Sequence, residues 1–148
     1  MNIIADTCFW RTLCNPSEKN YAEVIEMAEK IFDNKAHQIL VPHPVLYETL
    51  CTKMVKNSKQ VMLLTHYFNM AVKVSDKEYV NEAYQKIEQQ ATMQRGNASM
   101  VDIAIMLMAE DPRNNVKGIL TFNGRDFSSF CQRNRIPMIE NMTVLNSI

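Results

Sequence analysis

The feature that most constrains this chain is the alternation of short apolar runs with longer stretches of helical periodicity. Short β-prone runs bounded by polar residues are typical of buried strands. Such runs occur at 2–5, 38–41, 71–74, 118–120 and 136–139. Strands that alternate with helices pair in parallel, and a parallel sheet needs cover on both faces. The pattern therefore predicts an α/β fold with a central, mainly parallel sheet of short strands.

Capping residues and prolines delimit the predicted helices. Ser17 is expected to cap a helix that runs to about residue 34, and Pro44 to open a helix over 45–56. Asp76 is interpreted as the cap of a long helix that Gly96 and Asn97 end. Further helices are expected after residue 58, from 99 to about 111, and from just beyond 126 to about 134.

Length and composition favour one soluble domain. The 148 residues match an ordinary domain, so residues 1–148 are expected to form a single unit. Every apolar run is interrupted before the roughly 20 residues that a membrane helix needs. The start, MNIIADT, lacks the basic residues and the long apolar core of a signal peptide. We therefore expect a cytoplasmic protein with no membrane partner.

The sequence argues against several common kinds of site. The four cysteines show no CxxC spacing and no pairing with histidine at zinc-ligand distances, so reduced and mostly packed thiols are expected. The chain has no GxSxG, P-loop or GxGxxG motif. Phosphatases that carry Asp after the first strand need a second Asp two residues later, where this chain has Cys8.

Four acidic residues are candidates for a common site. Asp6 directly follows the first predicted strand, and Asp126 follows the strand at 118–120 within the segment KGILTFNGRDF. Glu48 lies one turn into a helix, and Asp102 lies in the first turn of a helix that is apolar almost all round. Because the carboxyl ends of parallel strands meet at one edge of a sheet, these side chains can converge.

Each of these acids also has a purely structural interpretation. Asp6 can cap the turn that follows it, and Ser99 with Asp102 fits a Ser-x-x-acid capping box. Glu48 can be an ordinary solvated residue of its helix. An aspartate in a buried helix is costly unless it is paired or binds a metal, which favours a functional role for Asp102.

The chemistry of this residue set points to a divalent cation. Mg²⁺ and Mn²⁺ prefer oxygen ligands, and a cation keeps adjacent carboxylates ionised. In phosphodiester cleavage such ions activate water and polarise the phosphate. Lys53 and Arg125, each within a small basic cluster, are candidate substrate-binding residues, although such clusters are often only solvated faces.

The segments ADT, PVLYE, SMVDIAIMLMA and LTFNGRDF, in this order, resemble the PIN domain, and within it the ribonuclease toxins of bacterial VapBC-type toxin–antitoxin systems. The resemblance spans nearly the whole chain. It implies a PIN-like three-layer α/β/α sandwich and a Mg²⁺- or Mn²⁺-dependent endoribonuclease. By the family pattern, the metal-binding and catalytic residues are Asp6, Glu48, Asp102 and Asp126. The expected supporting residues are Thr7, Thr121 and Asn123, and Ser99 joins them as the cap of the helix that carries Asp102.

The resemblance also implies partners. These are an RNA substrate, commonly a particular tRNA or an rRNA loop, a second copy of the chain in a homodimer, and a small antitoxin protein. Whether Asn123 or Asp126 completes the metal site stays open. Two other functions also stay open: a PIN-like nuclease of RNA processing or phage defence without an antitoxin, and a catalytically inactive module that binds RNA or protein.

Overall fold

A parallel sheet organises the computed structural model, which describes residues 1–93 and 98–148. Within these residues the sheet has five strands in the order β3-β2-β1-β4-β5, and every pairing is parallel. The strands are β1 (Asn2–Ala5), β2 (Gln38–Pro42), β3 (Val72–Val74), β4 (Val116–Leu120) and β5 (Met138–Ile139). The predicted α/β class and parallel sheet are confirmed. As the position of Pro137 implied, β5 is an edge strand.

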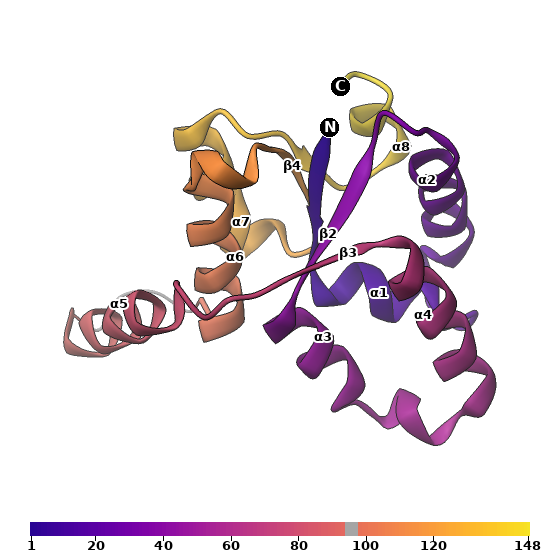
Figure 1. The fold of residues 1–148 in the computed structure, drawn as a ribbon, viewed down its shortest axis with the longest axis horizontal. Helices are drawn as coiled ribbons and strands as arrows, with labels where there is room; N and C mark the ends of the chain where they lie inside the picture. Colours follow the sequence, from indigo (N-terminus) through magenta and orange to yellow (C-terminus); the bar gives the residue numbers. More distant parts are fainter. Residues whose placement is uncertain (94–97) are drawn as a thin grey trace.

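Helices cover both faces of this sheet. Successive residues of a strand point to opposite faces, and Ile3 and Ile4 of the central strand are both almost completely buried. The α-helices are α1 (Thr7–Leu13), α2 (Tyr21–Asp33), α3 (His43–Leu50), α4 (Ser58–Met70), α5 (Val80–Met93), α6 (Met100–Glu110), α7 (Gly124–Asn134) and α8 (Met142–Leu145). α6 and α7 lie on one side of the sheet, and α2 and α4 on the other (Figure 1). The three-layer sandwich is therefore confirmed.

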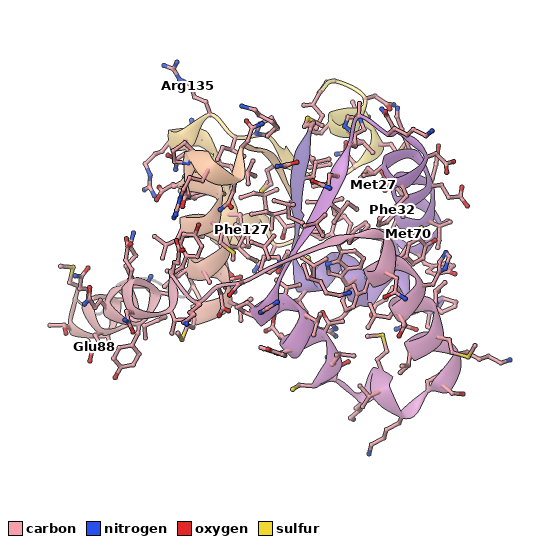
Figure 2. The ribbon with its side chains drawn as sticks, in the orientation of Figure 1. Met27, Phe32, Met70, Glu88, Phe127 and Arg135 are labelled. Carbon is pink, nitrogen blue, oxygen red and sulfur yellow. The ribbon has the colours of Figure 1, made fainter. Side chains whose placement is uncertain are left out.

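Aromatic packing fixes α1 beneath the end of β1. Trp10 is fully buried and packs edge-to-face on Phe9 and Phe68, with ring centroids 5.2 and 4.8 Å apart. Its indole Nε1 donates to the carbonyl of Ala5 at 3.2 Å, so its polar atom is also satisfied. On the other side of the sheet Phe127 points into the interior, whereas Arg135 projects outward (Figure 2). α1 is thus held rigidly where the first strand ends.

α5 is the least integrated helix. It extends away from the sheet beside α6 (Figure 1), and its buried contact is a small cluster of Ala83 with Ile103 and Leu107. No helix in the described part of the chain is long and apolar enough to cross a membrane.

Two predicted helix starts are wrong, each because a turn forms first. α2 begins at Tyr21 rather than at Ser17, because the Ser17 backbone N–H donates to the Asn15 side chain and a turn occupies the intervening residues. α5 begins at Val80, because the Asp76 carbonyl accepts from the two backbone N–H groups that precede and open the helix. The predicted end of this helix at Gly96 and Asn97 lies outside the described residues.

The helix predicted over 45–56 is also divided. α3 ends at Leu50, and a separate 3-10 helix, η1 (Lys53–Lys56), follows. The Thr52 hydroxyl donates to the carbonyl of Thr49 and accepts from the backbone N–H of Met54, which closes one helix and starts the other. After this break, η1 lines a cavity together with Arg11 of α1.

Candidate active site

The carboxyl edge of the sheet carries a cavity of about 290 Å³. The four acids predicted from the sequence, Asp6, Glu48, Asp102 and Asp126, all line it. Thr7, Ser99 and Asn123 line it as well. These side chains come from segments that are far apart in the chain, and the parallel topology brings them to one place.

Asp6 is the most heavily engaged of the acids. It lies at the end of β1, is only 5% exposed, and caps α1 through a 2.6 Å hydrogen bond from the backbone N–H of Thr7. Its other oxygen accepts from the Thr121 hydroxyl at 2.9 Å and from the Cys8 thiol at 3.1 Å. The capping interpretation of Asp6 is therefore correct, and the same side chain also faces the cavity.

Asp102 is likewise both a cap and a cavity residue. Its carboxylate accepts from the backbone N–H of Ser99 at 2.8 Å, and the Ser99 hydroxyl accepts from the backbone N–H of Asp102 at 3.1 Å. The predicted capping box is therefore present at the start of α6. Asp102 is 8% exposed, so its position is fixed by the cap while its charge is nearly buried.

Glu48 reaches the cavity from α3 and is the exposed member of the set. The Thr7 hydroxyl donates a short hydrogen bond to the Glu48 carboxylate. Thr7 thus connects two of the acids, because its backbone N–H is bonded to Asp6 while its side chain holds Glu48.

Asp126 lies in the first turn of α7, which begins at Gly124, and not in a loop as its sequence context predicted. Asn123 donates to one carboxylate oxygen at 2.7 Å, and the exposed Arg125 guanidinium lies 3.3 Å from the other. The Asn123 hydrogen bond, more than Arg125, holds the pKa of Asp126 below its usual range. Asp126 is therefore ionised at neutral pH, with both oxygens already engaged by protein groups.

Burial makes Asp6 electrostatically different from Asp126. Desolvation raises the pKa of Asp6 above its ordinary value, and the nearby charge of Asp102 raises it further. Hydrogen bonds from Cys8, Thr121 and Thr7 oppose this shift without cancelling it. The cavity thus presents two nearly buried carboxyl groups that repel each other when both are ionised.

The donor set suits a hard divalent cation, because carboxylate oxygens dominate the cavity. Among the residues that the structure describes, however, no three acidic, histidine or cysteine side chains are grouped closely enough to hold a metal ion. The four carboxylates therefore share a cavity without sharing a preformed coordination sphere. A cation of this type would relieve the repulsion between Asp6 and Asp102.

The remaining predicted residues lie just outside the cavity. Thr121 is fully buried and acts through its bond to Asp6, while its hydroxyl also accepts from the backbone N–H of Asn123 at 3.0 Å. Arg125 contacts Asp126 from the solvent side. Lys53 does not line this cavity; it lines a neighbouring one.

Two cavity residues, Cys8 and Arg11, were missed by sequence reasoning. Arg11 had a usable signal, since a helix that starts at Thr7 places Arg11 one turn later on the same face. Cys8 had none, because a lone cysteine is usually a packing residue. In the structure its thiol accepts from the backbone N–H of Phe122 at 3.2 Å and so links α1 to the loop after β4.

Cys8 is expected to contribute to stability through these bonds. Cys8→Ala leaves the buried Asp6 oxygen and the Phe122 N–H each short of a partner, so we expect the free energy of unfolding to fall by about 1–2 kcal/mol. Cys8→Ser, which keeps a donor and an acceptor, is expected to lose less. Urea denaturation followed by circular dichroism measures both changes.

Cys51 provides the matched control, because its thiol is exposed and free. Cys51→Ala is expected to leave the free energy of unfolding unchanged, and an equal loss in the two alanine variants would refute the linking role of Cys8.

Burial raises the pKa of the Cys8 thiol to about 12, and the charge of Asp6 adds to this. Cys8 is therefore a neutral hydrogen-bonding group at physiological pH and not a thiolate nucleophile.

Comparison with known proteins gives structural matches only. No model of a protein family matches the chain, and no curated protein matches it in sequence. The crystal structure of Mycobacterium tuberculosis VapC20, a sarcin–ricin loop cleaving toxin, is similar with a TM-score of 0.65 and 17% identity over 86% of this chain and 93% of that chain. The structure of VapBC2 from Rickettsia felis, bound to a DNA fragment from their promoter, matches with a TM-score of 0.62 and 17% identity over 95% and 98% of the two chains. The chain therefore has a VapC-like PIN fold.

Proposed function

We propose that this chain is a Mg²⁺- or Mn²⁺-dependent endoribonuclease and the toxin of a toxin–antitoxin pair. The observation that carries the proposal is the gathering of Asp6, Glu48, Asp102 and Asp126 around one cavity at the carboxyl edge of a VapC-like PIN fold. Carboxylates in this number, without a nucleophile and base of the acyl-transfer type, fit metal-assisted hydrolysis of a phosphodiester.

The two nearly buried carboxylates are the proposed principal metal ligands. Asp6 and Asp102 are held in place by backbone and hydroxyl donors, so they would hold a cation with little movement of their own. Glu48 and Asp126 complete the acidic lining from α3 and α7. When bound, the cation would polarise the phosphate and lower the pKa of an attacking water.

The other residues of the site orient these groups. Thr7 holds the exposed Glu48 carboxylate at the cavity, where it can accept a proton from the attacking water. Asn123 donates to Asp126 and fixes its orientation. The buried Thr121 hydroxyl donates to Asp6 and thereby reduces the exposure of that carboxylate to water. In this scheme the supporting residues reduce the reorganisation that the acids need during the reaction.

The likeness to VapC structures supports the proposed partners. VapC20 cleaves the sarcin–ricin loop and VapBC2 is a complex bound to promoter DNA. By analogy we propose a structured RNA, a tRNA or an rRNA loop, as the substrate here, and a small antitoxin protein that occludes the acidic cavity.

Metal dependence gives the direct test of this function. Total RNA incubated with purified protein is expected to be cut in Mg²⁺ or Mn²⁺ and to stay intact in EDTA. The same ions are expected to raise the melting temperature, because a ligand that binds only the folded state stabilises it. Gel analysis of the RNA and differential scanning fluorimetry measure the two effects.

Ca²⁺ is a useful comparison ion in this experiment. It takes oxygen ligands but tolerates looser geometry, so it is expected to stabilise the protein while supporting less cleavage. Cleavage that persists in EDTA would eliminate the metal-dependent mechanism. Metal binding without any RNA cleavage would instead favour the inactive binding module.

A further inference from the structure

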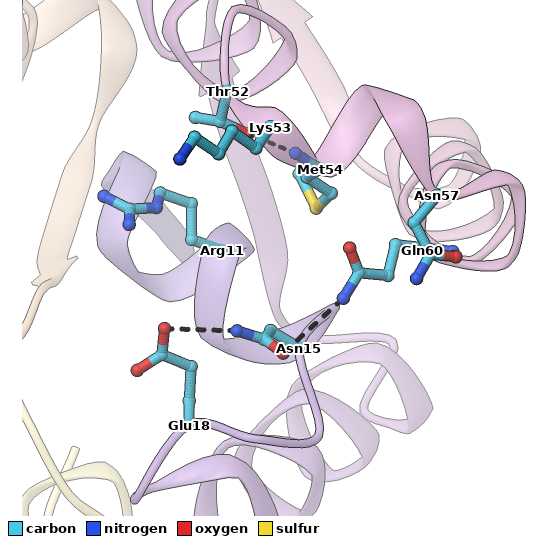
Figure 3. A pocket seen from close by; sticks show the side chains of 8 residues that line it. All are labelled: Arg11, Asn15, Glu18, Thr52, Lys53, Met54, Asn57 and Gln60. Atoms are coloured by element: carbon cyan, nitrogen blue, oxygen red, sulfur yellow. Dashed lines mark hydrogen bonds between the residues drawn. The ribbon is translucent and has the colours of Figure 1, made fainter.

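We infer that a second cavity, next to the acidic one, binds the nucleotide adjacent to the scissile phosphate of a single-stranded RNA segment. This inference rests on the proposed function and extends it to a substrate subsite. The cavity has a volume of about 370 Å³ and lies between α1, η1 and the start of α4 (Figure 3). This cavity and the acidic cavity share one residue. The other residues of this cavity have no role in the acidic site.

The shared residue is Arg11, which lines both cavities. It projects from α1 one turn after Thr7 and is exposed. Within the described residues no carboxylate lies within ion-pair distance of its guanidinium, although the adjoining cavity carries four acids. An unpaired guanidinium at the junction is well suited to bind a phosphate that passes from one cavity to the other.

Lys53 adds a second cation to the same side. In Figure 3 the Arg11 guanidinium and the Lys53 ammonium project to one side of the cavity. Lys53 also has no ion-pair partner in the part of the chain that the structure describes. The acid of this lining, Glu18, accepts a hydrogen bond from the Asn15 amide at 3.3 Å. Two cations at one rim of the cavity fit a backbone phosphate.

The opposite side of the cavity is rich in amide groups. Asn57 and Gln60 lie there (Figure 3), and the Gln60 amide N–H₂ donates to the Asn15 side chain at 3.5 Å. The Asn57 oxygen is used to cap α4, which leaves its N–H₂ group as a donor. Side-chain amides match the paired donors and acceptors on the edge of a nucleobase, and Met54 supplies an apolar wall.

The cationic side and the amide side of the cavity together match the phosphate and the base of one nucleotide. A phosphate on Arg11 and Lys53 places the attached base toward Asn57 and Gln60, and the next phosphate toward the acidic cavity. The RNA must be single-stranded at this point, because a base within a duplex has its Watson–Crick edge occupied. The subsite would therefore select an unpaired loop, and it would contribute to sequence preference.

The decisive comparison is between two lysines of the same 3-10 helix. Lys53→Glu is expected to weaken binding of a single-stranded oligoribonucleotide about tenfold, as expected for loss of one charge-assisted contact. It should also reduce the slope of log affinity against log salt by about 0.7, the value for one phosphate on a single strand. Lys56→Glu makes the same charge change at an exposed position that lines neither cavity, and should change affinity less than about twofold. Fluorescence anisotropy in EDTA measures affinity without cleavage.

The base contact is tested by combining Gln60→Ala with a scan of single abasic positions along the oligoribonucleotide. In the wild type one abasic position next to the cleavage site is expected to weaken binding several-fold. In Gln60→Ala that penalty should vanish, because the base has lost its partner. Circular dichroism and thermal melts establish that each variant is folded.

Binding and cleavage measured together distinguish failure of this inference from failure of the proposed nuclease function. Equal losses of RNA affinity in Lys53→Glu and Lys56→Glu would show only a general charge effect and would overturn the subsite. Cleavage by the wild type together with wild-type affinity in Lys53→Glu rejects the subsite alone. RNA binding that depends on Lys53 and Gln60, without cleavage in Mg²⁺, rejects the nuclease and retains the subsite. A wild type that binds no single-stranded RNA rejects the subsite, and it rejects the nuclease as well only if total RNA also stays intact in Mg²⁺.

Discussion

Asp6→Asn is expected to abolish metal-dependent RNA cleavage, with a loss of at least about 1000-fold in rate, the upper range for removal of one transition-state-stabilising group. The substitution keeps the size of the side chain and an oxygen that can accept from the Thr7 backbone N–H. It removes the charge on a carboxylate that is only 5% exposed and lies beside Asp102. The proposed cation would then lose its most buried anionic ligand.

The same substitution is expected to stabilise the metal-free protein. Burial raises the pKa of Asp6, so the folded state holds the proton more tightly than the unfolded chain does. Wild-type stability relative to Asp6→Asn should therefore fall as the pH rises from the ordinary carboxyl pKa of 3.8 through the raised folded-state pKa. Below that window both side chains are neutral, and the difference in stability should disappear.

Thermal melts in EDTA at a series of pH values, paired with melts in Mn²⁺, measure both consequences. Metal is expected to raise the melting temperature of the wild type and to leave that of Asp6→Asn nearly unchanged. Asp33→Asn is the matched control, because Asp33 is exposed at the end of α2 and does not line the acidic cavity. If Asp6→Asn were less stable than the wild type in EDTA at neutral pH, the burial argument would be wrong.

The sheet could be predicted from the sequence because its strands are short, buried and bounded by polar residues. Ile3 and Ile4 are apolar neighbours in a run too short for a helix, and a strand covered on both faces buries both. Helix starts were predicted less well, because side chains such as Asn15 can bind the backbone locally and form a turn instead. Such a turn displaced the helix start at Ser17, and a turn in which the Ser75 hydroxyl accepts from the Lys77 backbone N–H precedes the helix that was predicted to start at Asp76.

The residues of the candidate site were also predictable only in part. Asp6 and Asp102 could be placed because strand ends and caps have local sequence signatures. The neighbouring cavity could not be foreseen, since it depends on α1 bringing Arg11 beside η1, and η1 exists only because Thr52 interrupts the preceding helix. The contact between Cys8 and Phe122 depends on segments more than a hundred residues apart, for which the sequence holds no local signal.

Asp102 offers the sharpest separation between a structural and a catalytic role. Asp102→Asn keeps an oxygen that can accept from the Ser99 backbone N–H, so the capping box should survive. We expect the unfolding free energy to change by less than about 1 kcal/mol. The rate of RNA cleavage should nevertheless fall by about 100-fold or more, because the charge that faces the cavity is lost.

Ser99→Ala makes the complementary change. It deletes the hydroxyl that accepts from the Asp102 backbone N–H and should cost about 1 kcal/mol of stability. Cleavage should fall only about tenfold, the scale on which partners of metal-binding groups contribute. Urea denaturation and cleavage rates are measured on both variants. If Asp102 serves the reaction, Asp102→Asn is the more stable of the two and also the less active. If Asp102 were only a cap, Asp102→Asn would keep nearly wild-type activity, and Ser99→Ala would be the less active as well as the less stable of the two variants.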